Sequence, residues 1–335
     1  MAKQKYDLVS IGDCTIDTFM GLHDASVHCD LNHQNCQLCI SYADKVPYES
    51  LTVVPAVGNA SNVAVGTARL GLRSAAFTAI GSDYFGQEIL KVYKREKVAR
   101  EFVKINKNLP TNYHLVLNFR AERTILVKHQ EYQYFDPVRL GRINWLYFSS
   151  MGEHTLAFHQ KLSRYLEVHP KTRMGFNPGT FQLKLGAQKL KNIYRHTYVL
   201  FVNREEAQRI LRAKPSTGSG IKALFRGLHK LGPRIAAITD GPAGAYASDG
   251  ANQYYMPKYP DPKAPLERTG AGDAFSTGFM AALIYGLPIT EALRWAPVNS
   301  MSVVQEIGAQ KGLLTKRQLV RLLREAPKHY HPRKI

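Results

Sequence analysis

Short apolar runs alternate with segments of helical periodicity along most of this chain. Several runs are apolar without alternation, as strands buried on both faces of a sheet are. We predict strands at residues 6–12, 75–80, 144–150, 173–177, 197–203 and 234–239. We predict helices at residues 59–70, 84–97, 155–168, 204–213 and 221–231, and around 273–285, 290–306 and 315–325. This repetition favours an α/β fold with a doubly wound, mostly parallel sheet flanked by helices.

Two parts of the chain depart from the alternation. Residues 113–119 and 124–129, joined by RAER, predict a β-hairpin rather than a strand–helix–strand unit. Residues 14–57 hold short mixed runs between the first strand and the first helix. We therefore expect a small antiparallel β lid over one edge of the main sheet, built from segments at about 14–57 and 111–136.

The rest of the organisation is simple. There is no internal repeat and no long linker, so we predict one domain over residues 5–328 that includes the lid segments. Residues 329–335 form a basic tail that is expected to be frayed.

No apolar run approaches the roughly 18 to 20 residues that a membrane span needs, so no membrane partner is expected. The first residues, MAKQKYDLVSIGD, contain no signal-peptide core, and four cysteines do not form a disulfide framework. These features predict a cytoplasmic protein.

The charge of the chain is strongly positive. Its 45 Lys and Arg residues outnumber 26 Asp and Glu residues, which gives a formal net charge of +19. Such a field attracts anions, whether nucleic acid, an anionic membrane face or nucleotide phosphates. Because the basic residues are spread along the chain, we do not expect nucleic acid to be the primary partner.

The stretch ERTGAGDAFSTGF, residues 267–279, combines three glycines with one aspartate before an apolar run. Unpaired N–H groups at a helix N-terminus bind anions, and Gly270 and Gly272 would let the backbone approach a phosphate closely. Asp273 would then lie beside the anion, where a carboxylate can take a proton from an attacking hydroxyl. Alternatively, the glycines relieve a tight turn and Asp273 caps the helix.

Several segments, in this order, resemble the PfkB/ribokinase family of sugar and nucleoside kinases. TGAGDAFSTGF is similar to the second signature of that family, and VGNASNVAVGTARLG resembles the first. The resemblance extends over residues 6–325 and implies a ribokinase-like fold. Further matching segments are GSDYFGQ, FNPGT, NREEA, TDGPAGA and IGAQKG.

The resemblance implies roles for the phosphate-binding residues. Asp273 is similar to the catalytic base of the family, and Gly270, Ala271 and Gly272 are similar to its anion hole. Asn203 and Glu206 match the Asn-x-x-Glu motif, which handles Mg²⁺ and phosphate through water, in keeping with the hydrated chemistry of magnesium. The alternative is that Asn203 only caps a helix and Glu206 is a surface carboxylate.

The resemblance also implies an ATP site. Thr239, Gly241 and Gly244 resemble the loop that lines the ribose and phosphates, although Asp-Gly-Pro is also ordinary turn chemistry. Asn299 lies near the helix that contacts adenine, but Pro297 is closer to the contact position of the family.

A monovalent cation is less clearly implied. Many relatives hold K⁺ beside the anion hole, where aspartate and a small residue precede the glycine loop. This chain has Glu267 and Arg268 there. Glu267 could still serve, and Arg268 would place a positive charge near the phosphates or point to solvent.

For the acceptor, the resemblance implies that Asp17 grips sugar hydroxyls, with Gly58, Asn59 and Asn62 completing the pocket. Asp13 follows the same strand and has turn chemistry as its alternative role. Carboxylates and amides suit a polyol because they pair with its hydroxyl groups. The family usually has glycine in place of Val57, so the pocket entrance is expected to differ.

Residues 23–39, HDASVHCDLNHQNCQLC, are unusually rich in Cys and His. Cys29, Cys36 and Cys39 could ligate a structural Zn²⁺ together with His28 or His33. The alternative is a lid loop with reduced thiols.

Together, these patterns predict an ATP- and Mg²⁺-dependent kinase that phosphorylates a hydroxymethyl group of a sugar or nucleoside. The alternative is a catalytically idle member of the family that binds nucleotide or RNA. A dehydrogenase is disfavoured because no Gly-x-Gly-x-x-Gly follows the first strand. Exposed lid strands could also pair in a homodimer.

Overall fold

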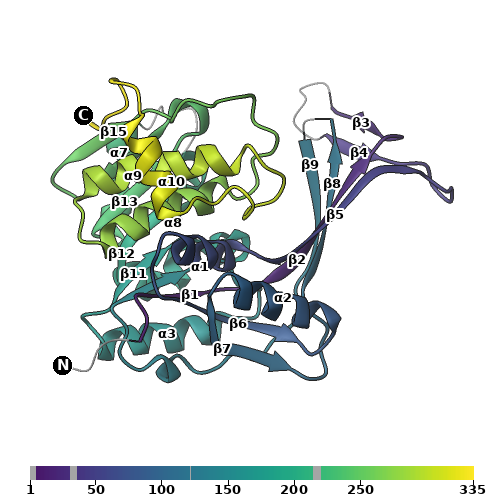
Figure 1. The fold of residues 1–335 in the computed structure, drawn as a ribbon. Coiled ribbons are helices and arrows are strands. Elements are labelled where there is room, and N and C mark those ends of the chain that lie inside the picture. The colour runs from purple at the N-terminus through teal and green to yellow at the C-terminus, as the bar shows by residue number, and fades with distance from the viewer. Residues whose placement is uncertain (1–4, 31–35, 121, 214–219) are drawn as a thin grey trace.

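The computed structural model describes residues 5–30, 36–120, 122–213 and 220–335. A ten-stranded sheet runs through the main body in the order β16-β15-β14-β13-β12-β11-β10-β1-β6-β7 (Figure 1). All pairings from β13 to β7 are parallel, and those from β13 to β16 are antiparallel. Its strands are β1 Leu8–Ile11, β6 Ser74–Gly81, β7 Ala99–Asn106, β10 Trp145–Phe148, β11 Arg173–Phe176, β12 Thr197–Asn203, β13 Ile235–Thr239, β14 Ala245–Ser248, β15 Gln253–Met256 and β16 Arg333–Lys334.

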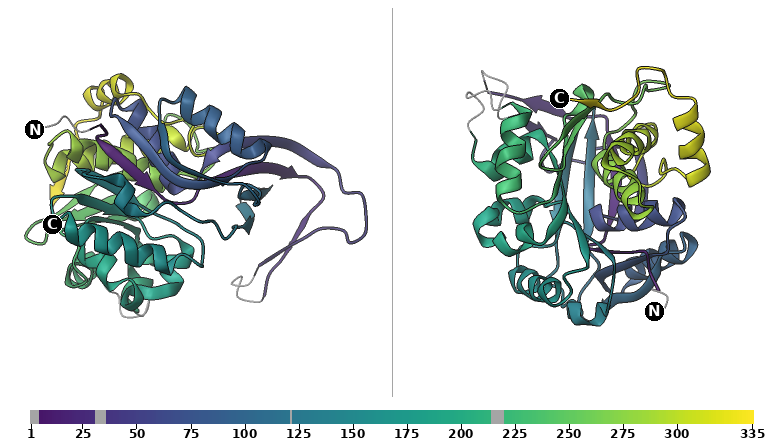
Figure 2. Two further views of the ribbon diagram at one scale, coloured as in Figure 1. Left: turned by 90° about the horizontal axis from the view of Figure 1, so that it is seen from below. Right: turned by 90° about the vertical axis from the view of Figure 1, so that its left-hand side faces the viewer.

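Helices cover both faces of this sheet (Figure 2). Successive residues of β1 pack on opposite faces of the sheet. Leu8 belongs to the apolar cluster that includes α1, α8, α9 and α10. Val9 belongs to the cluster that includes α3, α5, α6 and α7. The predicted doubly wound sheet is thus confirmed. The helices are α1 Asn59–Arg69, α2 Tyr84–Arg95, α3 Leu156–Val168, α4 Thr180–Lys189, α5 Lys191–Arg195, α6 Arg204–Leu211, α7 Ile221–Lys230, α8 Ala271–Ile284, α9 Ile289–Val303 and α10 Lys316–Arg324, with short 3₁₀ turns at Pro137–Leu140 and Gly241–Ala243. Within the described ranges, none of these helices is both long and apolar enough to cross a membrane.

A second, small sheet projects from the edge of the main body (Figure 1). Its strands, in the order β5-β2-β8-β9, are β2 Thr15–Leu22, β5 Tyr48–Val57, β8 Tyr113–Phe119 and β9 Glu122–Lys128. The predicted hairpin is confirmed as β8–β9, and the outer pairings are antiparallel. The central β2–β8 pairing is parallel, and these two strands follow β1 and β7, which run in the same direction in the main sheet. We call this sheet the lid sheet.

The Cys/His-rich insert extends from the lid sheet as a two-stranded arm, β3 Ser26–His28 paired with β4 Gln37–Cys39 (Figure 2). Cys29 and Cys36 form a disulfide, whereas the sequence suggested zinc ligands or reduced thiols. The strand pairing explains this difference, since it brings the two thiols together at the end of the ladder. His33 lies outside the described residues. Among the residues that are described, no group of three His, Cys, Asp or Glu side chains is placed to hold a metal.

The basic tail is packed, which corrects the prediction of a frayed end. Tyr330 is 2% exposed and donates a hydrogen bond of 2.7 Å to the carbonyl of Arg294. Arg333–Lys334 pairs with β15, and the N–H of Ile335 donates to the carbonyl of Gln253. A buried aromatic ring and an added strand outweigh the polar composition of this segment.

Candidate active site

Helix α8 begins at the carboxyl edge of the main sheet with its glycine loop. Gly270, the N-cap, has φ 79°, and a Cβ there would lie 2.4 Å from the Cβ of Ala309. Glycine is therefore required at this position by conformation and by packing. A Cβ at Gly272 would meet nothing within 4 Å. The N–H of Ala271 donates to the carbonyl of Arg268 at 3.3 Å, but no neighbouring atom obstructs the first turn of α8 at Gly272, which suits an anion.

Asp273, in the first turn of α8, is buried and held by two amides. Asn59 Nδ2 donates to Asp273 Oδ1 at 2.8 Å, and Asn62 Nδ2 donates to Asp273 Oδ2 at 2.7 Å. Burial raises the pKa of Asp273, while the two amide hydrogen bonds act in the opposite direction. The carboxylate is therefore fixed in orientation and is a stronger proton acceptor than an exposed aspartate.

A cavity of 310 Å³ opens beside Asp273. It is lined by the first turn of α8, the ends of β12 and β13, and one lid residue, Arg123 of β9. Asn59 of α1 and Glu206 of α6 also line it, so elements far apart in the sequence meet around the predicted base. Its predicted site residues are Asn59, Asn203, Glu206, Thr239, Gly270, Gly272 and Asp273.

The sequence left two roles open for Asn203 and Glu206: starting a helix, or forming part of the phosphate site. Their positions are compatible with both roles. Asn203 Oδ1 accepts from the N–H of Glu206 at 2.7 Å, and Glu206 Oε2 accepts from the N–H of Asn203 at 2.8 Å. This is a capping box that starts α6. Both residues also line the 310 Å³ cavity. Burial raises the pKa of Glu206, whereas Arg209 lowers it.

A second cavity, of 370 Å³, adjoins the first and shares Thr239, Arg268, Gly272 and Phe275 with it. Gly241 and Gly244, which the resemblance assigns to an ATP site, lie in its wall. Asn299 does not line this cavity: it is fully buried, donates to the carbonyl of Ala274 and accepts from the N–H of Leu314. Residues of α9 that do line it are Pro297, Ser300 and Met301.

The two residues before the glycine loop point to different neighbours. Arg268 lines both cavities and is also exposed to solvent, so both of its expected positions stay open. Glu267 Oε2 accepts from the N–H of Gly308 at 3.0 Å, and Oε1 lies 3.7 Å from Arg123 Nη1.

On the lid side, Asp13 is buried and heavily hydrogen-bonded. Its Oδ2 accepts from the N–H of Gly152 at 2.7 Å and lies 3.1 Å from His129 Nδ1, and its Oδ1 accepts from the hydroxyl of Tyr134. A carboxylate has about four acceptor positions, so one remains available. Gly58 has φ 114°, and a Cβ there would lie 2.5 Å from the carbonyl oxygen of Asp13. Asp13 is thus brought next to the start of α1.

Asp17 lies on β2 of the lid sheet, with its Oδ1 3.2 Å from His114 Nδ1 on β8. Neither Asp13 nor Asp17 lines the cavity at Asp273. Asn62 is also absent from that lining, because it is buried between Asp273 and Gln310, whose Nε2 donates to Asn62 Oδ1. Asn62 therefore positions Asp273.

Sequence reasoning missed the residues that complete these contacts. His114, Arg123, His129 and Tyr134 come from or follow the predicted hairpin, and they reach partners more than 90 residues away. The only signal for them was the concentration of polar and aromatic residues around that hairpin.

Proteins of similar sequence include kinases of known name. The chain is 27% identical over 283 residues to the ribokinase of Bacillus subtilis, covering 82% of this chain and 89% of that protein. It is 23% identical over 275 residues to the nucleoside kinase of Methanothermobacter thermautotrophicus, covering 76% and 80%.

Solved structures share the fold. The ribokinase of Arabidopsis thaliana complexed with ribose and ATP superposes with a TM-score of 0.78 at 17% identity, covering 96% of this chain and 99% of that one. The nucleoside kinase of Methanocaldococcus jannaschii superposes with a TM-score of 0.77 at 16% identity, covering 97% and 100%. The sequence profile of the family described as "pfkB family carbohydrate kinase" matches residues 26–316. Since that match spans most of the chain, the protein is a phosphotransferase that belongs to the pfkB family of carbohydrate kinases.

Proposed function

We propose that this protein transfers the γ-phosphoryl group of ATP to a hydroxymethyl group of a sugar or nucleoside. The observation that carries the proposal is the position of Asp273: a buried carboxylate, oriented by Asn59 and Asn62, in the first turn of the helix where two cavities adjoin. Phosphoryl transfer depends mainly on positioning and charge stabilisation, and this arrangement supplies both.

In the proposed reaction, Asp273 accepts the proton of the acceptor hydroxyl as that oxygen attacks the γ-phosphorus. The N–H groups of Gly270, Ala271 and Gly272 stabilise the negative charge on the transferring group, aided by the dipole of α8. For this, the N–H of Ala271 would exchange its 3.3 Å bond to the carbonyl of Arg268 for one to the phosphoryl group. Arg268, at the boundary of the two cavities, adds a positive charge beside the phosphates. ADP is the leaving group.

The 370 Å³ cavity is our candidate for the nucleotide base and ribose. Its wall combines Gly241 and Gly244 with apolar residues of α9, as a nucleoside requires. Magnesium fits the donor set beside it. Glu206 offers a carboxylate in the 310 Å³ cavity, and Mg²⁺ is commonly held by one or two carboxylates, phosphates and water. When bound, Mg²⁺ would neutralise phosphate charge, with Asn203 nearby as an amide partner for its water.

The acceptor is proposed to lie between Asp13 and Asp17 on the lid side and Asp273 on the other. Asn59 lies at the boundary, since it bonds Asp273 and directly follows Gly58, whose backbone touches Asp13. The lid sheet would exclude water as it closes, which suppresses idle hydrolysis of ATP. Residues 5–328 would then act as one domain, with lid segments 14–57 and 111–136.

The lid sheet is also our candidate for a homodimer contact. Leu51 and Val53 of β5 and Leu126 and Val127 of β9 are 48% to 57% exposed. Apolar strands of this kind pair readily with a second copy.

Glu267 is the only residue that we propose as a ligand for K⁺. Measuring activity over a range of KCl concentrations tests whether the enzyme depends on K⁺.

A screen of ADP release across ribose, fructose, their phosphates and nucleosides tests the proposed function. We expect at least one acceptor to raise ADP release well above the rate without acceptor. ADP release that stays at that background with every acceptor, together with salt-dependent RNA binding, would support the idle alternative instead.

The first prediction concerns the pH dependence of turnover. Asp273 must be ionised to accept a proton, and its raised pKa means that kcat/KM falls with decreasing pH at a value above the ordinary 3.8. Asn59→Ala removes a hydrogen bond that favours the ionised form, so the acidic limb should move up by about one pH unit. Profiles of kcat/KM for both proteins check this. If the acidic limb of the kcat/KM profile does not move in Asn59→Ala, that limb reflects the titration of another group, such as Glu206.

The same raised pKa has a consequence for folding. The folded state binds the proton of Asp273 more tightly than the unfolded state does. The contribution of this group to stability is therefore largest at low pH and is lost as the pH rises through the folded pKa.

The second prediction separates activity from stability at Gly272. A Cβ at this helical position meets no neighbouring atom but occupies the wall of both cavities. Gly272→Ala should therefore leave the free energy of unfolding unchanged or raise it by roughly 0.5–1 kcal/mol. It should lower kcat/KM at least about tenfold by crowding the phosphoryl site. Urea unfolding and initial rates check the two parts, and a fully active variant would contradict the assignment of residues 270–272.

A further inference from the structure

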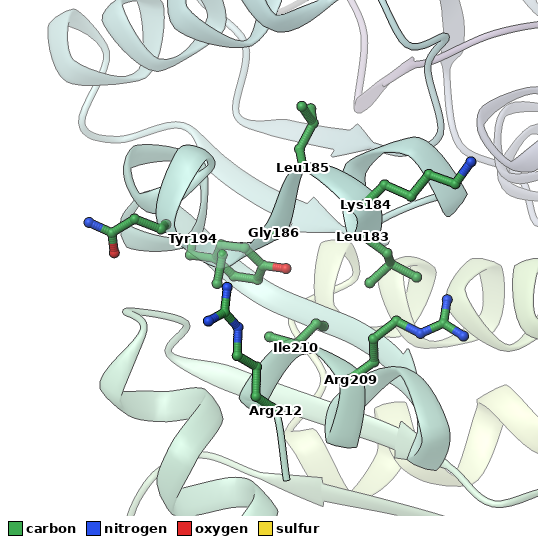
Figure 3. Close-up of a pocket in the computed structure, with 10 residues that line it drawn as sticks. Leu183, Lys184, Leu185, Gly186, Tyr194, Arg209, Ile210 and Arg212 are labelled. Carbon is green, nitrogen blue, oxygen red and sulfur yellow. The ribbon is translucent and has the colours of Figure 1, made fainter.

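A third cavity, of 450 Å³, lies between α4–α5 and α6 (Figure 3). It shares no lining residue with the two cavities at Asp273. It lies on the face of the main sheet that is covered by α3 and α5–α7. The proposed reaction makes no use of it.

The cavity has an unbalanced positive charge. Lys184 of α4 and Arg209 and Arg212 at the end of α6 line it, and none of the described residues in its lining is acidic. None of these three side chains forms an ion pair with any residue in the described ranges. Guanidinium groups without carboxylate partners are well suited to phosphate, which they bind in a bidentate manner.

The cavity also contains a hydroxyl group that lacks a partner. Tyr194 of α5 is 1% exposed, and no hydrogen bond of its hydroxyl is found among residues 5–30, 36–120, 122–213 and 220–335. Figure 3 shows this hydroxyl pointing into the space between α4 and α6. Burial raises the pKa of Tyr194, so the phenol keeps its proton and is a donor. The hydroxyl borders the cavity, where a ligand or water can accept from it.

Helix stability alone does not account for this arrangement. A basic side chain in the last turn complements the helix dipole, and Arg209 is such a residue in α6. That explanation does not extend to Lys184, which comes from another helix, or to the hydroxyl of Tyr194 at the cavity wall. The remaining wall includes the apolar residues Leu183, Leu185 and Ile210, so the space suits an organic group as well as an anion.

We propose that this cavity is a regulatory site for a small organic phosphate, bound by Arg209, Arg212 and the hydroxyl of Tyr194. Its organic part packs on the leucine and isoleucine side chains. Binding itself does not depend on the proposed kinase reaction.

The cavity is connected to the active site through α6. This helix spans only eight residues, with Asn203 and Glu206 at its start and Arg209 and Arg212 at its end. A phosphate that engages Arg209 and Arg212 acts on the end of the same short helix whose start carries Asn203 and Glu206, so it should weaken the affinity for Mg²⁺-ATP; this part rests on the proposed function.

Binding is tested by calorimetry with glycerol 3-phosphate as the probe and glycerol as its uncharged counterpart. The protein is saturated with Mg²⁺ and a non-hydrolysable ATP analogue, so that the active site is filled. We expect saturable binding of glycerol 3-phosphate and none of glycerol. Arg212→Gln and Tyr194→Phe should each weaken binding about tenfold. Arg226→Gln, an equal loss of charge on the exposed face of α7, should leave it unchanged.

Two outcomes would overturn the proposal: one-for-one competition between the probe and the analogue, or equal affinity in the wild type and all three variants. Regulation is tested by initial rates, where glycerol 3-phosphate should raise the KM for Mg²⁺-ATP in the wild type and in Arg226→Gln but not in Arg212→Gln. If no acceptor supports turnover, the proposed function fails while the calorimetric result still decides the binding site.

Discussion

Asp273→Asn is expected to lower kcat/KM by about 10² to 10⁴, the usual contribution of a general base. Asparagine preserves the size of the side chain but cannot take the proton of the acceptor hydroxyl. The 370 Å³ cavity that we propose for the nucleotide is lined by other residues, so ATP affinity should stay within about twofold. Initial rates and calorimetry with ATP measure the two quantities.

The hydrogen bonds around Asp273 add a smaller expected effect on stability. In the variant, an NH₂ group must face the NH₂ group of Asn59 or of Asn62. Asn62 cannot turn its amide freely, because its Oδ1 already accepts from Gln310. Loss of one hydrogen bond should lower the free energy of unfolding by about 1–3 kcal/mol. Asp136→Asn is the matched control: its carboxylate is half exposed, and this variant should match the wild type in rate. Turnover by Asp273→Asn at the wild-type rate would contradict the proposed role.

Gly270→Ala is expected to be among the most destabilising substitutions in the chain. The positive φ of 79° costs an alanine about 1–2 kcal/mol. The added Cβ would lie 2.4 Å from the Cβ of Ala309, and such overpacking typically costs about 1–3 kcal/mol more. The expected total is roughly 2–5 kcal/mol, measured by urea unfolding.

Gly286, at the other end of α8, provides a matched control. It has the same φ of 79°, but a Cβ there meets nothing within 4 Å. Gly286→Ala should therefore show only the backbone part, about 1–2 kcal/mol. Equal losses in the two variants would mean that the contact with Ala309 is not what fixes glycine at position 270.

The main sheet was predictable because its signals are local. Runs such as residues 197–203 and 234–239 are apolar throughout, and the helices between them have a clear period. The antiparallel edge was missed because β14 and β15 are only four residues long and carry little pattern. The packed tail was missed because its anchor, Tyr330, finds its pocket only in the folded chain.

In the candidate site, too, local sequence motifs were predictable and long-range contacts were not. The glycine loop and the Asn-x-x-Glu motif were recognisable because each is contiguous in sequence. The roles of Asn62 and His129 were not, because they follow from contacts that span 211 and 116 residues. The hypothetical zinc site failed for a related reason: residue types indicated ligands, but strand pairing decided which thiols meet.

The capping box of α6 has an evolutionary consequence. Asn203 and Glu206 start a helix whether or not any metal or phosphate is handled there, so a descendant that lost turnover would still be selected to keep both residues. Gly272 is under the opposite pressure, since no contact or backbone angle requires glycine at this position and alanine would favour the helix. Among similar sequences, an intact Asn-x-x-Glu motif would therefore not distinguish working enzymes from idle ones, whereas replacement of Gly272 would identify chains released from selection for phosphoryl transfer.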